Sequence, residues 1–228
     1  MKRLLAMSDI HGNLNKFEKM IDKVNLTKED RLVIMGDNVD RGKHSIELIF
    51  RIKELKDEGY DIITLMGNHE DMLIYFIEQY KSVEALLYGK DGASAVHNGT
   101  ANTFDNYMKL SNNDKELFLN EIKSYRSHYE LLDYLFVHAG VMPETPLEWQ
   151  DIDDMLWIRK GFVDKVSHGL PYTVIFGHTP TSNLNENNEF KVWRMNDKIG
   201  IDCGAASIGG SLACLDVLND IEYYVWKY

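Results

Sequence analysis

Three short apolar runs in the first part of the chain share one pattern of hydrophobic and polar positions. The runs are mainly aliphatic, are bounded by Gly, Ser or Asp, and cover Leu4–Met7, Leu32–Met35 and Ile62–Met66. A short continuous apolar run of this kind is typical of a parallel strand that is buried on both faces. Apolar residues recur at helical spacing between the runs, so the pattern predicts consecutive strand–helix–strand units.

The helical spacing is clear in both intervening segments and continues after the third run. It is carried by Phe17, Met20, Ile21 and Val24 in the first segment and by Ile46, Ile49, Ile52 and Leu55 in the second. Residues 70–124 are predicted to be mainly helical, and the glycines favour a loop from Gly89 to Gly99.

Short apolar and aromatic runs separated by tight turns dominate the second half of the chain. The predicted strands are Tyr129–Leu132, Leu135–His138, Val174–Phe176, Val192–Met195, Ile199–Asp202, Leu212–Leu218 and Ile221–Trp226. A strand–helix half followed by a strand-rich half predicts an α/β fold in which two sheets pack face to face with helices outside. No Pro/Ser-rich linker or charge block divides the chain, so we expect one domain over residues 1–228.

Each of the first three runs ends in the same short motif, which we call a phrase: a small residue followed by a side chain with an oxygen that can bind metal. The phrases close at Asp9, Asp37 and Asn68, which are 28 and 31 residues apart, and His11 and His69 stand close to the first and third. Because parallel strands bring their carboxyl ends to one edge of a sheet, we expect these five side chains in one pocket. Taken singly, each phrase also fits a polar strand end, a capping loop or a turn. Their repetition at three strand ends favours a metal site.

Two predicted strands of the second half end in histidines, His138 and His178. A lone histidine in such a place is more often a structural residue than a ligand, but both repeat the setting of the first three phrases. The remaining histidines lack this setting: we expect surface positions for His44, His128 and His168 and leave the role of His97 open.

Together these donors suffice for two metal ions that share the Asp37 carboxylate. Mixed carboxylate, amide and imidazole ligation without thiolate fits Mn, Fe or Zn. Two such ions share a water and lower its pKa, so hydroxide for in-line attack on phosphorus is available near neutral pH. The predicted ligands are Asp9, His11, Asp37, Asn68, His138 and His178.

Four further side chains are predicted to complete a phosphoester-cleaving site. His69 follows the ligand Asn68 directly, and Asp40 is suited to hold its imidazole protonated, so this pair is the candidate general acid. Arg41 and Arg159 are candidate phosphate clamps, because a guanidinium fork matches two phosphoryl oxygens. Asn68 is expected to lie beside the bound phosphate, and Arg159 also fits an exposed arginine on a helix.

Composition limits the partners of such a site. The chain has 228 residues and a formal net charge of −11, which disfavours nucleic-acid partners. Cys203 and Cys214 form no CxxC pair and are expected to be buried thiols in a reducing compartment. No apolar run approaches the roughly 20 residues of a membrane span, and no signal-peptide pattern precedes the first strand, so we expect a cytoplasmic protein without a membrane partner. The oligomeric state is left open.

Five segments of the chain resemble the signature blocks of the PPP family of metal-dependent serine/threonine phosphatases: GDxHG, GDxVDRG, GNHE, HAG and GH. They stand here, in the same order, as Ser8–Gly12, Gly36–Gly42, Gly67–Glu70, His138–Gly140 and Gly177–His178. The compact length and the segments Trp157–Arg159 and Ile201–Ala205 are similar to the bacterial and bacteriophage lambda branch. Ser8 replaces the usual glycine, and Asn38 stands where Tyr or Leu is commoner, which changes the expected pocket wall.

The resemblance implies a calcineurin-like αββα sandwich and two catalytic metal ions, usually manganese in bacterial members. It assigns Asp9, His11 and Asp37 to one metal, Asp37, Asn68, His138 and His178 to the other, His69 with Asp40 to the acid, and Arg41 with Arg159 to the phosphate.

Three activities are compatible with this site. Asp40 and Glu70 favour a phosphomonoesterase acting on phosphoserine or phosphothreonine proteins, with phosphotyrosine or a small phosphoester also open as substrates. The alternative is a symmetrical diadenosine tetraphosphate hydrolase. Such enzymes typically lack the aspartate that stands here as Asp40 in the GDxVDRG block, and they read GNHD where this chain reads GNHE. A metal-binding regulator without catalysis is the third. Residues 89–108 are the candidate substrate-facing insertion, although a surface helix and loop fit them equally well.

Overall fold

The computed structural model describes residues 1–226, so the last two residues of the predicted domain, 227–228, lie outside the described residues. The first of two mixed sheets has the strand order β10-β9-β1-β2-β3. Its strands are β1 (Leu4–Met7), β2 (Arg31–Ile34), β3 (Asp61–Thr64), β9 (Ser211–Asp216) and β10 (Ile221–Trp226). β1, β2 and β3 run parallel, and β9 pairs with β1 and β10 in antiparallel fashion.

The second sheet has the strand order β4-β5-β6-β8-β7 and is also mixed. Its strands are β4 (His128–Leu131), β5 (Tyr134–Val137), β6 (Thr173–Phe176), β7 (Trp193–Met195) and β8 (Lys198–Gly200).

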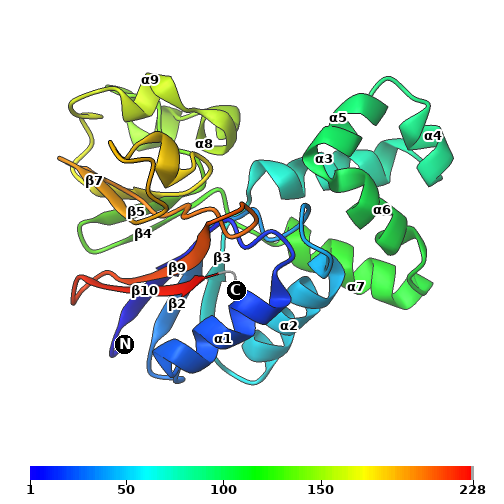
Figure 1. The fold of residues 1–228 in the computed structure, drawn as a ribbon, viewed down its shortest axis with the longest axis horizontal. Coiled ribbons are helices and arrows are strands. Elements are labelled where there is room, and N and C mark those ends of the chain that lie inside the picture. The colour runs from blue at the N-terminus through cyan, green and yellow to red at the C-terminus, as the bar shows by residue number, and fades with distance from the viewer. Residues whose placement is uncertain (227–228) are drawn as a thin grey trace.

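Helices cover the outer faces of both sheets and form a lobe beside them (Figure 1). The helices next to the sheets are α1 (Leu14–Val24), α2 (Ser45–Asp57), α8 (Ile152–Trp157) and α9 (Lys160–Val163), and the lobe contains α3 (Asn68–Gln79), α4 (Val83–Leu87), α5 (Gly92–Asn98), α6 (Thr100–Met108) and α7 (Asn112–Lys123). Two short 3-10 turns, η1 (Leu147–Trp149) and η2 (Thr181–Asn183), lie in connecting loops.

Alternate residues of β1 show how the layers are held together. Leu5 faces Phe17 of α1, whereas Leu4 and Ala6 belong to the core between the sheets, together with Phe136 of β5. Since successive side chains of a strand point to opposite faces, a strand covered on both faces must be apolar throughout. Each fully buried leucine contributes about 1.5–3 kcal/mol of burial free energy. The apolar runs read from the sequence therefore lie at the centre of the sandwich.

The structure confirms the predicted αββα fold class, with three differences. The strand-rich second half is divided between the sheets, because β9 and β10 extend the first sheet beyond β1. The predicted loop from Gly89 to Gly99 is wrong, since most of it forms α5, which buries Ala95. The predicted surface position of His168 is also wrong: its ring is fully buried and lies against Phe162.

The two cysteines are buried free thiols, as expected. Among residues 1–226, no helix combines the length and hydropathy that crossing a membrane requires.

Candidate active site

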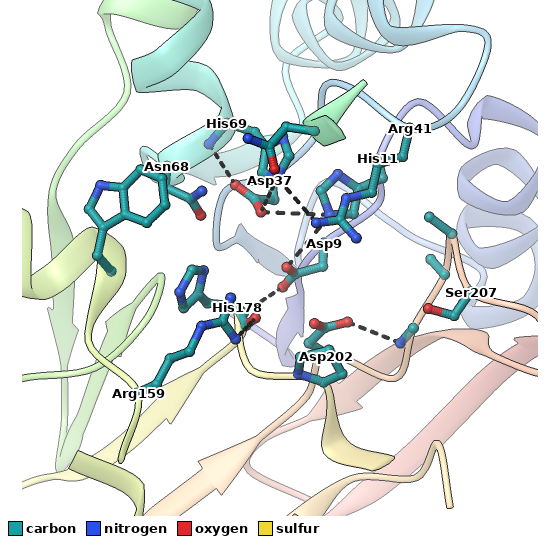
Figure 2. Close-up of a pocket in the computed structure, with 16 residues that line it drawn as sticks. Asp9, His11, Asp37, Arg41, Asn68, His69, Arg159, His178, Asp202 and Ser207 are labelled. Carbon is teal, nitrogen blue, oxygen red and sulfur yellow. Dashed lines mark hydrogen bonds and ion pairs between the residues drawn. The ribbon is translucent and has the colours of Figure 1, made fainter. Parts of the chain in front are cut away.

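The loops after β1, β2 and β3 meet at one edge of the first sheet and line a cavity of about 110 Å³. Figure 2 shows side chains that face it, which come from all three loops and, in the second half, from three segments around Arg159, His178 and Asp202. Of the predicted site residues, the cavity is lined by Asp9, His11, Asp37, Arg41, Asn68, His69, Arg159 and His178. The other two, Asp40 and His138, lie directly behind this lining and contact it.

Tight backbone turns bring these loops together. Six site residues have a left-handed backbone, which is costly for residues other than glycine: Asp9, His11, Asp37, Asp40, Arg41 and His178. Neighbouring glycines allow the close approach, since a Cβ on Gly36 would lie 2.6 Å from the Cα of Gly67. The strain is concentrated where the side chains converge, which is typical of a functional site.

The Asp37 carboxylate lies at the centre of the cluster. Its Oδ2 is 3.6 Å from Nε2 of His11 and 3.8 Å from Nε2 of His69, and its Oδ1 is 3.4 Å from Nε2 of His138. Two groups of ligand atoms, each compact enough to hold a metal ion, share this carboxylate: His11, Asp37 and His69, and Asp37, His138 and His178.

Backbone carbonyls orient the imidazole rings for this purpose. Nδ1 of His11 contacts the Val39 carbonyl at 2.8 Å, and Nδ1 of His138 contacts the Met35 carbonyl at the same distance. A carbonyl can only accept, so each Nδ1 carries the hydrogen and Nε2 faces the cluster with its lone pair. Nε2 of His178 is buried without a hydrogen-bond partner among the described residues. An orphaned imidazole nitrogen beside a carboxylate fits a metal ligand.

The charge balance of the cluster also fits a cation. Burial, together with the negative charge of Asp37, raises the pKa of the Asp9 carboxyl to about 7. Burial lowers the pKa of His11 to about 3 and that of His178 to about 2, so both rings are neutral and able to ligate. The carboxyl groups of Asp9 and Asp37 are therefore buried beside imidazoles that carry no charge. A divalent ion would supply the positive charge that balances them.

His69 differs from the other imidazoles of the cluster. Its Nδ1 donates to Oδ2 of Asp40 at 2.7 Å, and its Nε2 faces the cavity, 3.5 Å from a guanidinium nitrogen of Arg41. Burial alone lowers the pKa of His69, but the negative charges of Asp37 and Asp40 outweigh it and raise the pKa to about 9. A protonated imidazole is suited to donate a proton, although the ring also lies within reach of a metal beside His11.

The two predicted phosphate-binding arginines both line the cavity (Figure 2). Arg159 lies between α8 and α9, is exposed and donates to the His178 carbonyl at 2.8 Å, which fixes its guanidinium at the rim. The alternative of an exposed arginine on a helix is correct about the exposure, but the residue lies just outside both helices and its side chain lines the cavity.

Three residues with a place in the site received no role from the sequence. Glu70 is fully buried and accepts hydrogen bonds from the backbone N–H groups of Asp37, Asn38, Val39 and Gly67. Ser8, noted as a departure from glycine, donates to Oδ2 of Asp9 at 2.6 Å. Asp202 lines the cavity, and burial raises its pKa well above the usual value. All three residues stand in motif segments that the sequence reveals, but the sequence does not reveal which groups they contact.

A match to a family model agrees with this geometry. Residues 2–220 match the model of the calcineurin-like phosphoesterases, so the chain belongs to that family. The sequence-based expectation of a metallophosphoesterase is confirmed. Family members use divalent metals, which agrees with the two groups of ligand atoms around Asp37.

Similar proteins carry the name of one activity in particular. The chain is 28% identical over 148 residues to the symmetrical bis(5'-nucleosyl)-tetraphosphatase of Haemophilus ducreyi, covering 62% of this chain and 46% of that protein. It is 25% identical over 146 residues to the enzyme of the same name from Nitrosospira multiformis, covering 64% and 46%. The chain thus spans about half the length of these relatives. The narrower resemblance to the bacteriophage lambda branch remains a prediction.

Solved structures with the same fold include proteins of two activities. One, provisionally assigned as a diadenosine tetraphosphatase, has a TM-score of 0.69 and 19% identity and covers 99% of this chain and 94% of its own. A cold-active protein tyrosine phosphatase has a TM-score of 0.59 and 16% identity, covering 98% and 78%. These likenesses support the fold.

Proposed function

We propose that the protein is a dinuclear-metal phosphoester hydrolase that cleaves dinucleoside polyphosphates such as diadenosine tetraphosphate. The observation that carries the chemistry is the Asp37 carboxylate between two imidazole-containing groups. The shared name of the relatives supports the substrate class. It is the alternative drawn from the sequence, and the relatives favour it over the phosphoprotein phosphatase that the motifs alone favoured.

The predicted ligand set fits two metal ions, most readily manganese. Asp9, His11 and Asp37 would hold one ion, and Asp37, Asn68, His138 and His178 the other. When bound, the metals supply positive charge and lower the pKa of water. Arg41 and Arg159 then bind the phosphoryl oxygens. Hydroxide bonds to phosphorus as the P–O bond to the leaving oxygen breaks, and His69 donates its Nε2 proton to that leaving oxygen while Asp40 holds Nδ1.

A second cavity offers room for the part of the substrate beyond the scissile phosphate. It has a volume of about 320 Å³ and shares Arg41 and Ala206 with the first cavity. Lys43 and His44 also line it. In a chain with a net charge of −11, the Arg41 and Lys43 cations at this cavity are suited to the further phosphates of a dinucleoside polyphosphate.

One observation favours a second candidate, a phosphomonoesterase of the protein phosphatase type. The His69–Asp40 contact of 2.7 Å supports a general acid. A seryl or threonyl alkoxide is a basic leaving group and needs such an acid, whereas a nucleoside diphosphate leaves with less help.

The two candidates are separated by offering diadenosine tetraphosphate and phosphoserine, phosphothreonine or phosphotyrosine peptides at equal concentration, with Mn, Fe, Zn or Mg. We expect the dinucleotide to be cleaved faster, between the second and third phosphates, giving two ADP. Faster cleavage of a phosphopeptide would support the second candidate. Two bound metals without cleavage of any phosphoester would support a non-catalytic regulator.

A further inference from the structure

The helical lobe returns to the active site through one short segment, Asn98–Thr100. α5 ends at Asn98 and α6 begins at Thr100, with the left-handed Gly99 between them. A Cβ on Gly99 would lie 2.8 Å from the backbone nitrogen of Arg41, so this segment packs directly on the loop after β2. Asn98 itself lines the cavity.

The first residue of α6 contacts the acid pair. The Thr100 side chain is fully buried, and its hydroxyl donates to Oδ2 of Asp40 at 2.5 Å. The same oxygen accepts Nδ1–H of His69 at 2.7 Å. The other carboxylate oxygen, Oδ1, has no hydrogen-bond partner among the described residues. Thr100 therefore provides one of the two hydrogen bonds recorded for this carboxylate.

A second threonine of α6 supports the backbone of Asp40. Thr103, one turn further along the helix, donates to Oγ of Ser45 at 3.4 Å, and that oxygen accepts the Asp40 backbone N–H at 2.9 Å. Residues three apart share a helix face, so Thr100 and Thr103 present one polar surface to Asp40. The support of Asp40 therefore comes from one face of α6.

We propose that Thr100 is a positioning residue for the Asp40–His69 pair, which makes the helical lobe part of the catalytic machinery. The inference rests on the proposed phosphoester hydrolysis but not on its substrate. The hydroxyl fixes the rotation of the Asp40 carboxylate, the carboxylate fixes the His69 ring, and Nε2 then points at the leaving oxygen. Without the Thr100 hydroxyl the Asp40 carboxylate is free to rotate, so that either of its oxygens can face His69. The His69 ring then loses its fixed orientation.

The test compares Thr100→Val, which keeps the shape and removes the hydroxyl, with Thr100→Ser, which keeps the hydroxyl. Both manganese-loaded variants and the wild type are assayed on p-nitrophenyl phosphate, which has a good leaving group, and on an alkyl phosphate, which has a poor one. We expect Thr100→Val to lower kcat about 10- to 100-fold on the alkyl ester and about threefold or less on the aryl ester. KM and metal content should stay unchanged, and Thr100→Ser should restore the rate.

Equal losses on both esters, or no loss on either, would overturn the inference, because a purely structural role does not depend on the leaving group. If Thr100→Val does not fold, Thr100→Ala carries the same comparison. The ¹⁵N spectrum of the zinc-loaded protein gives a second readout that needs no turnover. The His69 Nδ1–H signal should shift in Thr100→Val and return in Thr100→Ser, and an unchanged signal would refute the positioning role. Failure of the proposed substrate class is seen separately, in the wild type's rate on diadenosine tetraphosphate.

Discussion

The Glu70 carboxylate accepts a hydrogen bond of 2.8 Å from the backbone N–H of Asp37, the residue proposed to bridge the two metals. The same carboxylate accepts from the N–H groups of Asn38, Val39 and Gly67. Glu70 is the third residue of α3, so one side chain both caps that helix and fixes the loop after β2. The glutamate of the GNHE block thus holds two ligand-bearing loops in register.

We therefore expect Glu70→Ala to destabilise the metal-free protein. Four buried N–H groups would lose their acceptor, at about 1–3 kcal/mol each, so the free energy of unfolding should fall by at least about 4 kcal/mol. For a chain of this size that is a drop in Tm of roughly 8–16 °C. Calorimetry of chelator-treated protein checks it, with Glu70→Gln as the matched control that should lose less. An unchanged Tm would show that the loop is held by other contacts.

His69→Asn separates the two roles that the geometry allows for this ring. If His69 is the general acid, kcat should fall about 10²- to 10⁴-fold while both metals stay bound. Asp37→Asn is the contrasting variant and should weaken both metals together. Mass spectrometric metal analysis alongside the kinetics decides between them. Loss of one metal from His69→Asn would make this ring a ligand, as its distance from Asp37 also permits.

Lys43→Ala tests whether the second cavity receives part of the substrate. Lys43 is exposed and lines that cavity but not the first. We expect its removal to raise KM for diadenosine tetraphosphate about fivefold, which corresponds to about 1 kcal/mol for one exposed ionic contact. KM for p-nitrophenyl phosphate should not change. Lys109→Ala is the control, because Lys109 is exposed and lines neither cavity. An equal rise in KM in that variant would show that Lys43 acts only through the net charge of the protein and not by contact with the substrate.

The sequence was most informative where local pattern and topology coincide. Apolar runs that end in a ligand predict parallel strands, and parallel strands must bring those ends to one edge. For this reason the convergence of Asp9, Asp37 and Asn68 could be expected from the sequence. His138 and His178 followed from the same rule, because β5 and β6 are also parallel neighbours.

Contacts between distant segments left no local signal. Thr100 lies 60 residues from Asp40 in an unremarkable helical stretch, and its hydroxyl points inward only because α6 packs on the loop after β2. His168 looked like a surface residue because its contact with Asp197, 29 residues further along the chain, leaves no local pattern. The pairing of β9 with β1 joins segments about 200 residues apart, which no turn or periodicity can specify.

The ion pair between Arg3 and Asp30 makes a prediction about pH and stability away from the active site. Arg3 donates to Asp30 at 2.6 Å and 3.0 Å, and this contact lowers the pKa of the buried Asp30 carboxyl from 3.8 to about 2. A carboxyl whose pKa is depressed by folding stabilises the native state above its unfolded pKa. That contribution, about 2 kcal/mol, should be present above pH 4 and lost as the pH falls toward 2.

Replacing this carboxylate should remove that part of the pH dependence. Asp30→Asn is expected to be less stable than the wild type by about 2 kcal/mol at pH 7, with the difference shrinking as the pH falls from 4 to 2. Urea unfolding at several pH values measures the difference directly, and comparing two proteins cancels the titration of the metal site. Asp57→Asn, which changes an exposed carboxylate paired with Lys53, should alter stability by less than about 1 kcal/mol. A constant gap between wild type and Asp30→Asn at all pH values would mean that the buried carboxylate contributes through its shape alone and not through its charge.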